Sequence, residues 1–200
     1  MSSRRLVLLI GCAAALWGTA TAWAQQQGGQ TGRAGSPAEL MSALKVGQWV
    51  KIEGPAASAP IVQCTQAKML TGDFLDGDWQ ISADVRSVDA AKGTFMVFTM
   101  PCKLGEGCTF KSKNNPGFKS LAQLKPGMYV NIEGTFLRDG TLLANKVSDK
   151  ASELDTKPDH KGSVRLRGRI DKLNPSAMTV TVMNITFQVN SHTQAKSVIR

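Results

Sequence analysis

The sequence predicts an all-β protein with short helices, built as two OB-like five-stranded β-barrels. Apolar and polar residues alternate with a period of two along most of the chain, which is typical of half-buried strands. An 11-residue segment near the N-terminus returns in similar form near the middle. The central elements follow the order of three strands, a helix and two strands, which is the order of an OB barrel.

Residues 1–24 have the pattern of a secretory signal peptide. Arg4 and Arg5 precede an apolar run over 6–17, and Ala22-Trp23-Ala24 supplies the small residues of a cleavage site. An uncleaved membrane anchor and a lipoprotein with lipidated Cys12 are the alternatives. No later segment has the length and apolarity of a membrane span. We therefore expect a periplasmic or secreted protein with no stable membrane span after cleavage.

The mature chain is basic, and its charge is uneven. Removing two arginines from 24 basic and 15 acidic residues leaves a net charge of +7. Residues 25–110 carry 7 basic and 8 acidic groups, whereas residues 111–200 carry 15 and 7. A basic half suits an anionic partner, although a solvated basic surface would have the same composition. Residues 25–35, rich in Gly and Gln, are expected to be a disordered linker.

Two copies of one unit account for the internal similarity. Residues 44–54 and 124–134 are identical at seven of eleven positions, and Trp49 corresponds to Tyr129. Residues 79–98 align more weakly with 164–183 in apolar positions and turn placement.

The elements can be placed in chain order. Ser36 and Glu39 form a capping box with Pro37 at the first helical position, which predicts a helix to about residue 44. Alternation and turn residues then predict strands and a second helix at 79–88, 93–100, 108–112, 119–124 (helix), 128–135 and 140–148.

The segments before and after the central strands are each expected to form part of a second barrel. Residues 36–69 contain only the later part of a unit, and 163–191 only its first three strands. We therefore expect a split barrel of 36–69 plus 163–191, with a central barrel of 79–148 inserted. Tandem barrels of 36–113 and 118–191 are the alternative.

The sequence resembles a family of small secreted bacterial domains of unknown function with OB-like strands. The features that carry the resemblance are the Gly-x-x-Val-x-Ile-x-Gly strand at 127–134, the Asp139-Gly140 turn and the Ala-x-x-Val strand at 144–147. The resemblance implies a fold and a compartment, and supplies no catalytic residue.

The mature chain has three cysteines. In an oxidising compartment, Cys102 and Cys108 are expected to form a disulfide that closes a hairpin loop, and Cys64 is expected to be a buried free thiol. Met96 and Met100 would complete a soft copper site with this pair. Methionines on a strand usually fill a core, and His160 and His192 lie elsewhere, so we expect no metal.

Three arginines form the most distinctive polar pattern. Arg165, Arg167 and Arg169 alternate with apolar residues, so on a strand they would form one row about 13 Å long. Guanidinium groups bind carboxylates and phosphates, and Lys161 and Lys172 lie nearby in sequence. A solvated or edge-protecting strand would show the same row.

Trp49 and Tyr129 point away from the predicted cores. Exposed, they would offer stacking surfaces to bases or sugars; buried, they would pack between the two barrels. Packing is the preferred interpretation.

The sequence contains no nucleophile elbow, phosphate-binding loop or zinc-protease motif. We therefore expect a non-catalytic periplasmic binding or scaffolding module without a cofactor, whose partner is an unknown envelope protein or an anionic polymer. The alternative is a polyanion binder that holds acidic polysaccharide or lipopolysaccharide phosphate through the arginine row. Nucleic acid is a less favoured ligand.

Overall fold

The computed structural model describes residues 36–58 and 60–198, so the predicted signal peptide and linker lie outside the described residues. The first elements are α1 (Pro37–Ala43), β1 (Trp49–Pro55), η1 (Ala56–Ser58), β2 (Ile61–Gln63) and β3 (Gln66–Leu70). The central elements are β4 (Trp79–Asp89), β5 (Thr94–Val97), β6 (Met100–Ser112), η2 (Leu121–Gln123), β7 (Tyr129–Phe136) and β8 (Leu142–Asp149). The last are α2 (Ala151–Thr156), η3 (Pro158–His160), β9 (Ser163–Asn174), β10 (Thr179–Val182), β11 (Ile185–Gln188) and β12 (Gln194–Val198). The predicted mostly β fold is confirmed.

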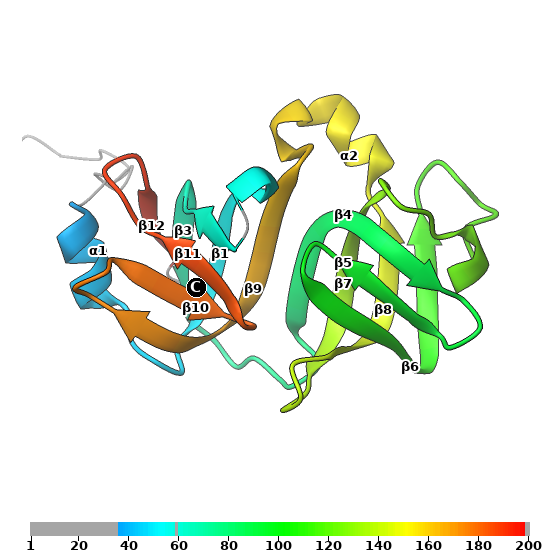
Figure 1. The fold of residues 1–200 in the computed structure, drawn as a ribbon, viewed down its shortest axis with the longest axis horizontal. Helices are drawn as coiled ribbons and strands as arrows, with labels where there is room; N and C mark the ends of the chain where they lie inside the picture. Colours follow the sequence, from blue (N-terminus) through cyan, green and yellow to red (C-terminus); the bar gives the residue numbers. More distant parts are fainter. Residues whose placement is uncertain (1–35, 59, 199–200) are drawn as a thin grey trace, which may run out of the picture. The chain divides into compact units, whose positions relative to one another are not determined.

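The central strands form a closed five-stranded barrel. β4 pairs with β5, β5 with β6, β6 in parallel with β8, β8 with β7, and β7 again with β4. Alternate residues of β4 fill the interior, where Ile81, Ala83 and Val85 are buried. Gly134 permits the close approach of β7 and β8, because a Cβ there would overlap the carbonyl of Leu143. The barrel appears at the right of Figure 1.

The remaining strands pair with one another from opposite ends of the chain. β9 pairs with β1 and β10, β10 with β11, and β11 in parallel with β2. β1 also pairs with β3, which β12 joins in parallel. Cys64 and Thr65 separate β2 from β3, so the ladder is interrupted here, and a second closed barrel is not shown. The predicted domain boundaries stay a prediction.

Several elements differ from the expected boundaries. The two strands expected at 93–100 and 108–112 are β5 and a single long β6, separated by a turn at which Phe98 has a positive φ of 54°. The predicted helix at 119–124 is a short 3-10 turn. Its start is closed by Gln123, whose side-chain oxygen accepts the backbone N–H of Ser120. The capping box of α1 is present as expected, with Glu39 and Ser36 joined by reciprocal hydrogen bonds.

A short ladder joins the two sets of strands. β4 pairs with β9 through Gln80–Arg167, Ile81–Leu166 and Ser82–Arg165. As a result β3, β1, β9, β4 and β7 lie in succession in one sheet. The segment with α2 and η3 leads from β8 to β9 (Figure 1). No helix of residues 36–58 or 60–198 is long and apolar enough to cross a membrane.

Candidate binding site on the junction face

The outer surface of these five neighbouring strands is polar, and we call it the junction face. The strand registers align its side chains in two rows that run across the strands. The first row is Lys68, Lys51, Arg167, Gln80 and Glu133. The second row is Gln66, Glu53, Arg165, Ser82 and Asn131. The apolar neighbours Ile52, Leu166, Ile81 and Ile132 point to the interior and are buried. The alternation that builds the core therefore also builds this face.

The first row begins with three neighbouring cations. Lys51 lies opposite Lys68 on one side and Arg167 on the other, and Lys196 of β12 continues the row beyond Lys68. Neither Lys51 nor Lys68 forms an ion pair within the described part of the chain. Burial and the nearby Arg165 guanidinium lower the pKa of the Lys51 amine. Like charges placed directly opposite on paired strands destabilise a sheet.

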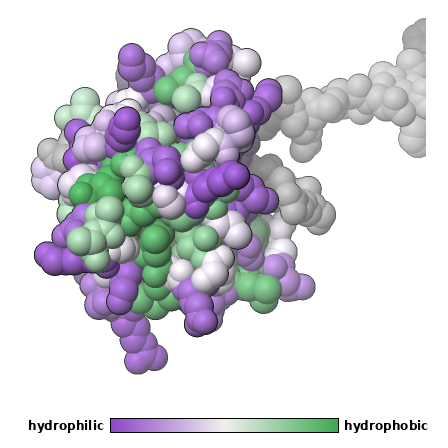
Figure 2. Space-filling view, turned by 90° about the vertical axis from the view of Figure 1, so that its right-hand side faces the viewer, coloured by the Kyte–Doolittle hydropathy of each residue, from purple (hydrophilic) through white to green (hydrophobic). Residues whose placement is uncertain are grey.

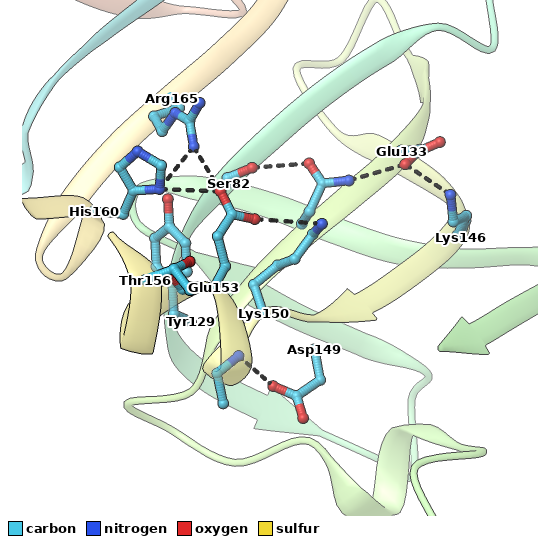
Figure 3. Close-up of polar contacts among 12 residues, drawn as sticks. Ser82, Tyr129, Glu133, Lys146, Asp149, Lys150, Glu153, Thr156, His160 and Arg165 are labelled. Atoms are coloured by element: carbon cyan, nitrogen blue, oxygen red, sulfur yellow. Dashed lines mark hydrogen bonds and ion pairs between the residues drawn. The ribbon is translucent and has the colours of Figure 1, made fainter. Parts of the chain in front are cut away.

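The second row is balanced. Arg165 donates from Nε to a carboxylate oxygen of Glu53 at 2.9 Å and from Nη1 to Glu153 of α2 at 3.2 Å. His160 Nδ1 lies 3.0 Å from both Arg165 Nη1 and Glu153 Oε1 (Figure 3). Burial raises the pKa of Glu153, but Lys150, Arg165 and His160 lower it by more, so the net shift is downward. This network fastens the connector between β8 and β9 to the sheet.

A chain of polar contacts continues across the barrel side. Ser82 donates to Asn131 at 2.8 Å, Asn131 donates to Glu133 at 3.0 Å, and Lys146 pairs with Glu133 at 2.9 Å (Figure 3). Gln80 makes no side-chain hydrogen bond among the described residues. Its amide therefore has a donor and an acceptor available.

Two hollows lie on the junction face. One of about 210 Å³ is lined by Lys51, Gln80, Ser82, Asn131, Glu133, Lys150, Glu153, Arg165, Leu166 and Arg167. The other, of about 250 Å³, is lined by Lys51, Lys68, Leu70, Thr71, Phe74, Gln80 and Arg167. Because Lys51, Gln80 and Arg167 line both, the hollows adjoin at the cationic part of the first row.

The structure keeps the predicted arginine row on one face but gives each arginine its own partner. Arg165 is held by two carboxylates. Arg167 donates to the Asp78 backbone carbonyl at 2.9 Å and lies 3.6 Å from its carboxylate. Arg169 lies over the Trp49 ring at 5.5 Å. The row therefore offers less free positive charge than its sequence suggested.

The two lysines predicted beside this row, Lys161 and Lys172, lie in different places. Lys161 lines a hollow of about 310 Å³ together with Arg165. Lys172 is exposed farther along β9, opposite Thr181 of β10, and lines neither hollow of the junction face.

Both candidate stacking aromatics are buried. Trp49 is 8% exposed and packs against Phe74 and Trp79, with ring centroids 4.9 and 5.0 Å apart. Tyr129 is 2% exposed, and its hydroxyl lies 3.5 Å from that of Ser163. Neither ring presents an open face to a base or sugar.

The structure does not contain the predicted Cys102–Cys108 disulfide, and all three described cysteines are free. Cys102 and Cys108 lie on the single strand β6 and do not flank a hairpin loop. Cys102 pairs with Leu142, and Thr109 with Lys146 four residues later, so the two cysteine Cα atoms are at least about 9 Å apart. A disulfide needs less than about 7 Å. Burial raises the pKa of the Cys102 thiol to about 12.

The soft ligands considered for copper do not converge on a histidine. Met100 and Cys102 are buried in the barrel, and His160 belongs to the Arg165 network. No group of three or more His, Cys, Asp or Glu that could hold a metal occurs within 36–58 and 60–198. Met96 is 38% exposed and lines a more apolar hollow of about 340 Å³. Figure 2, which views the barrel side, shows hydrophobic residues reaching the surface among hydrophilic ones.

The central cations of the site, Lys51 and Lys68, were missed by the sequence reasoning. Both occupy outward positions of an alternating strand, which was the available signal. Only the antiparallel register of β1 and β3, and the pairing of β1 with β9, bring them together with Arg167.

The comparisons with known proteins address the barrel. No curated protein and no solved structure matches the chain significantly. Residues 84–148, which run from the middle of β4 almost to the end of β8, match the model of a domain of unknown function, DUF5666.

Proposed function

We propose that the protein is a non-catalytic binding module of the bacterial periplasm whose ligand is an anionic polymer of the cell envelope. The proposal includes secretion through the signal pattern of residues 1–24 and an OB-like barrel with the element order of that fold. The observation that carries it is the cationic row formed by Lys196, Lys68, Lys51 and Arg167.

The row has the features of a ligand site. Neighbouring strands are about 4.8 Å apart, so four cations follow one another over about 14 Å. Only Arg167 has an acidic partner among the described residues. Such a row is unfavourable in the free protein, and an anion placed along it would remove the repulsion.

The neighbouring carboxylates support holding a ligand over transforming it. Glu53 is paired with Arg165, Glu133 with Lys146, and Glu153 with Lys150. A general base needs a carboxylate within reach of the proton that it removes. In these pairs the carboxylates are occupied by cations.

Retention on immobilised heparin tests the proposal, with the chain expressed from Gln25 onward. Wild type should bind at low salt and elute as salt rises. The double variant Lys51→Gln/Lys68→Gln should elute at clearly lower salt. The matched double variant Lys103→Gln/Lys125→Gln, which removes two exposed lysines outside the row, should elute close to wild type.

A third variant distinguishes binding by the cationic row, which runs across the strands, from binding by the arginine row along β9. Arg169→Gln, which removes an exposed arginine outside the cationic row, should have little effect on elution. If wild type is not retained at low salt, the polyanion function is wrong. If both lysine pairs shift elution equally, retention reports only net charge.

A further inference from the structure

The junction face is chemically divided, and the division restricts the ligand. The hollow beside Phe74 is lined by the cations Lys51, Lys68 and Arg167 and by no carboxylate. The adjoining hollow carries the carboxylates of Glu133 and Glu153. Lys51, Lys150, Arg165 and Arg167 line this second hollow too, and its two carboxylates are paired with cations. A ligand that crosses both hollows therefore first meets lysines without an ion pair among the described residues, and then charges that are paired within the protein.

The second hollow is suited to neutral hydroxyl groups. Gln80 has an unused amide, and Ser82 and Asn131 line the wall with further hydrogen-bonding capacity. The second carboxylate oxygen of Glu133 has no partner among the described residues and can accept from a hydroxyl donor, whereas both oxygens of Glu153 are paired. A polymer with a charge on every unit would instead place an anion beside these carboxylates.

The first hollow also provides an apolar wall. Leu70 and Phe74 line it, and the Phe74 ring is half-buried against Trp49. The face of a sugar ring presents C–H groups that pack against such a wall, while its charged substituent reaches the cations. A run of stacked bases would meet a single ring here, Phe74, because Trp49 and Tyr129 are buried.

We propose that the ligand of the junction face is an acidic glycan whose anionic groups alternate with uncharged sugars. Its carboxylate or phosphate lies at Lys51, between Lys68 and Arg167, and its neutral sugar lies over Gln80, Ser82 and Asn131. The proposal rests on the proposed function, and it names the ligand class and the subsite of each part of the ligand.

Titration calorimetry with defined probes tests the ligand class. Hyaluronan oligosaccharide carries one carboxylate per two sugars, and its carboxyl-reduced form is the neutral control. A phosphorylated mannan and its dephosphorylated form test phosphate in the same way, so the two pairs distinguish the source of the charge. At least one charged glycan should bind, and removing its charge should weaken binding about tenfold or more. Short polyphosphate, charged on every unit, should bind less tightly than that glycan.

Two variants test the subsites. Lys51→Gln should weaken binding of the charged glycan about tenfold and leave the neutral form unaffected. Gln80→Ala should weaken the glycan several-fold and leave polyphosphate unchanged, since only the glycan uses the amide. Lys103→Gln is the charge-matched control, and each variant should keep the wild-type urea midpoint to within a small shift.

The outcomes separate this inference from the function on which it rests. If polyphosphate binds at least as tightly as the tighter-binding glycan, or Gln80→Ala has no effect, the glycan inference is wrong and polyanion binding stands. Binding of single-stranded DNA in preference to both glycans would overturn it in the same way. If no charged polymer binds, the proposed function itself is wrong.

Discussion

Replacing Lys51 by glutamate should stabilise the free protein while it removes ligand binding. In wild type the Lys51 amine lies opposite two cations, Lys68 and Arg167. Lys51→Glu would turn both repulsive cross-strand pairs into attractive ones. β1 and β9 already contain such an opposite-charge pair two residues further along, where Glu53 lies opposite Arg165. The fold therefore accepts a carboxylate at such a position.

The size of the effect follows from these pairs. An opposite-charge cross-strand pair contributes about 0.2–1 kcal/mol, and a like-charge pair destabilises by a similar amount. Each exchange therefore changes stability by about 0.4–2 kcal/mol, and two exchanges by about 0.8–4 kcal/mol. Partial burial of the new carboxylate and its repulsion of Glu53, two residues away, oppose this gain. We expect a net stabilisation of about 1 kcal/mol, or about 2–4 °C in Tm for a domain of this size.

Urea unfolding at pH 7 measures the change, with an unchanged m value as evidence that only stability has moved. Lys103→Glu makes the same charge change at an exposed position and should stay within about 0.5 kcal/mol of wild type. Heparin retention of Lys51→Glu should fall below that of Lys103→Glu. A Lys51→Glu variant that is less stable than wild type, with the control unchanged, would refute the reasoning that this row is electrostatically strained.

The pH dependence gives an independent check on the same group. The folded-state pKa of Lys51 is lowered from its ordinary value of 10.5, first by burial and then by Arg165. The unfolded chain therefore binds this proton more tightly than the folded protein does. Wild type should gain stability relative to Lys51→Met as the pH rises through the lowered pKa toward 10.5, and anion binding should weaken over the same range.

Three other changes probe the frame around the site. Arg165→Met removes a guanidinium bound by two carboxylates and should lower stability by about 2 kcal/mol in urea. Because the pKa of Glu153 is lowered, the stability difference between wild type and Arg165→Met should be present above pH 4.5 and shrink as the pH falls through the lowered pKa. A difference below 0.5 kcal/mol at pH 7 would contradict this expectation. Gly134→Ala would force β7 and β8 apart and should cost about 2 kcal/mol or more, again by urea; wild-type stability would show that the strands can separate freely. In folded protein, iodoacetamide should modify the half-buried Cys108 and spare Cys102, as read by peptide mass; a disulfide between them in non-reduced protein would contradict the strand geometry.

Local chemistry in the sequence predicted local structure well. The Ser36–Glu39 capping box is present, and the alternation along 164–170 places its apolar residues inside and its arginines outside. These features depend on neighbours within a few residues, where side-chain spacing and backbone geometry are directly linked. The order of the central elements also followed from alternation and turn residues, which are local signals.

The failures share one physical cause, which is strand register. The predicted disulfide assumed a hairpin loop between the two cysteines, whereas β6 continues through residues 102–108, with a shift in its register against β8 between Leu104 and Thr109. Two of the acidic partners of the arginine row, Glu53 and Asp78, are about 90 residues or more away in sequence, and a third, Glu153, lies on the connector 12 residues before Arg165. Register between distant strands depends on global packing, and no local pattern encodes it.

The proposed site is assembled from parts of the chain that the family match does not contain. Residues 84–148 include Asn131 and Glu133, which line the hollow that also contains Gln80 and Ser82. The cations Lys51, Lys68 and Arg167 come from β1, β3 and β9, which lie outside that range. A barrel with only the matched elements would thus present hydrogen-bonding groups without the cationic row. Pairing of β9 with β4 joins these cations to the barrel, so the anion binding that we propose would belong to the joined sheet and is not a property to expect of every domain that matches the same model.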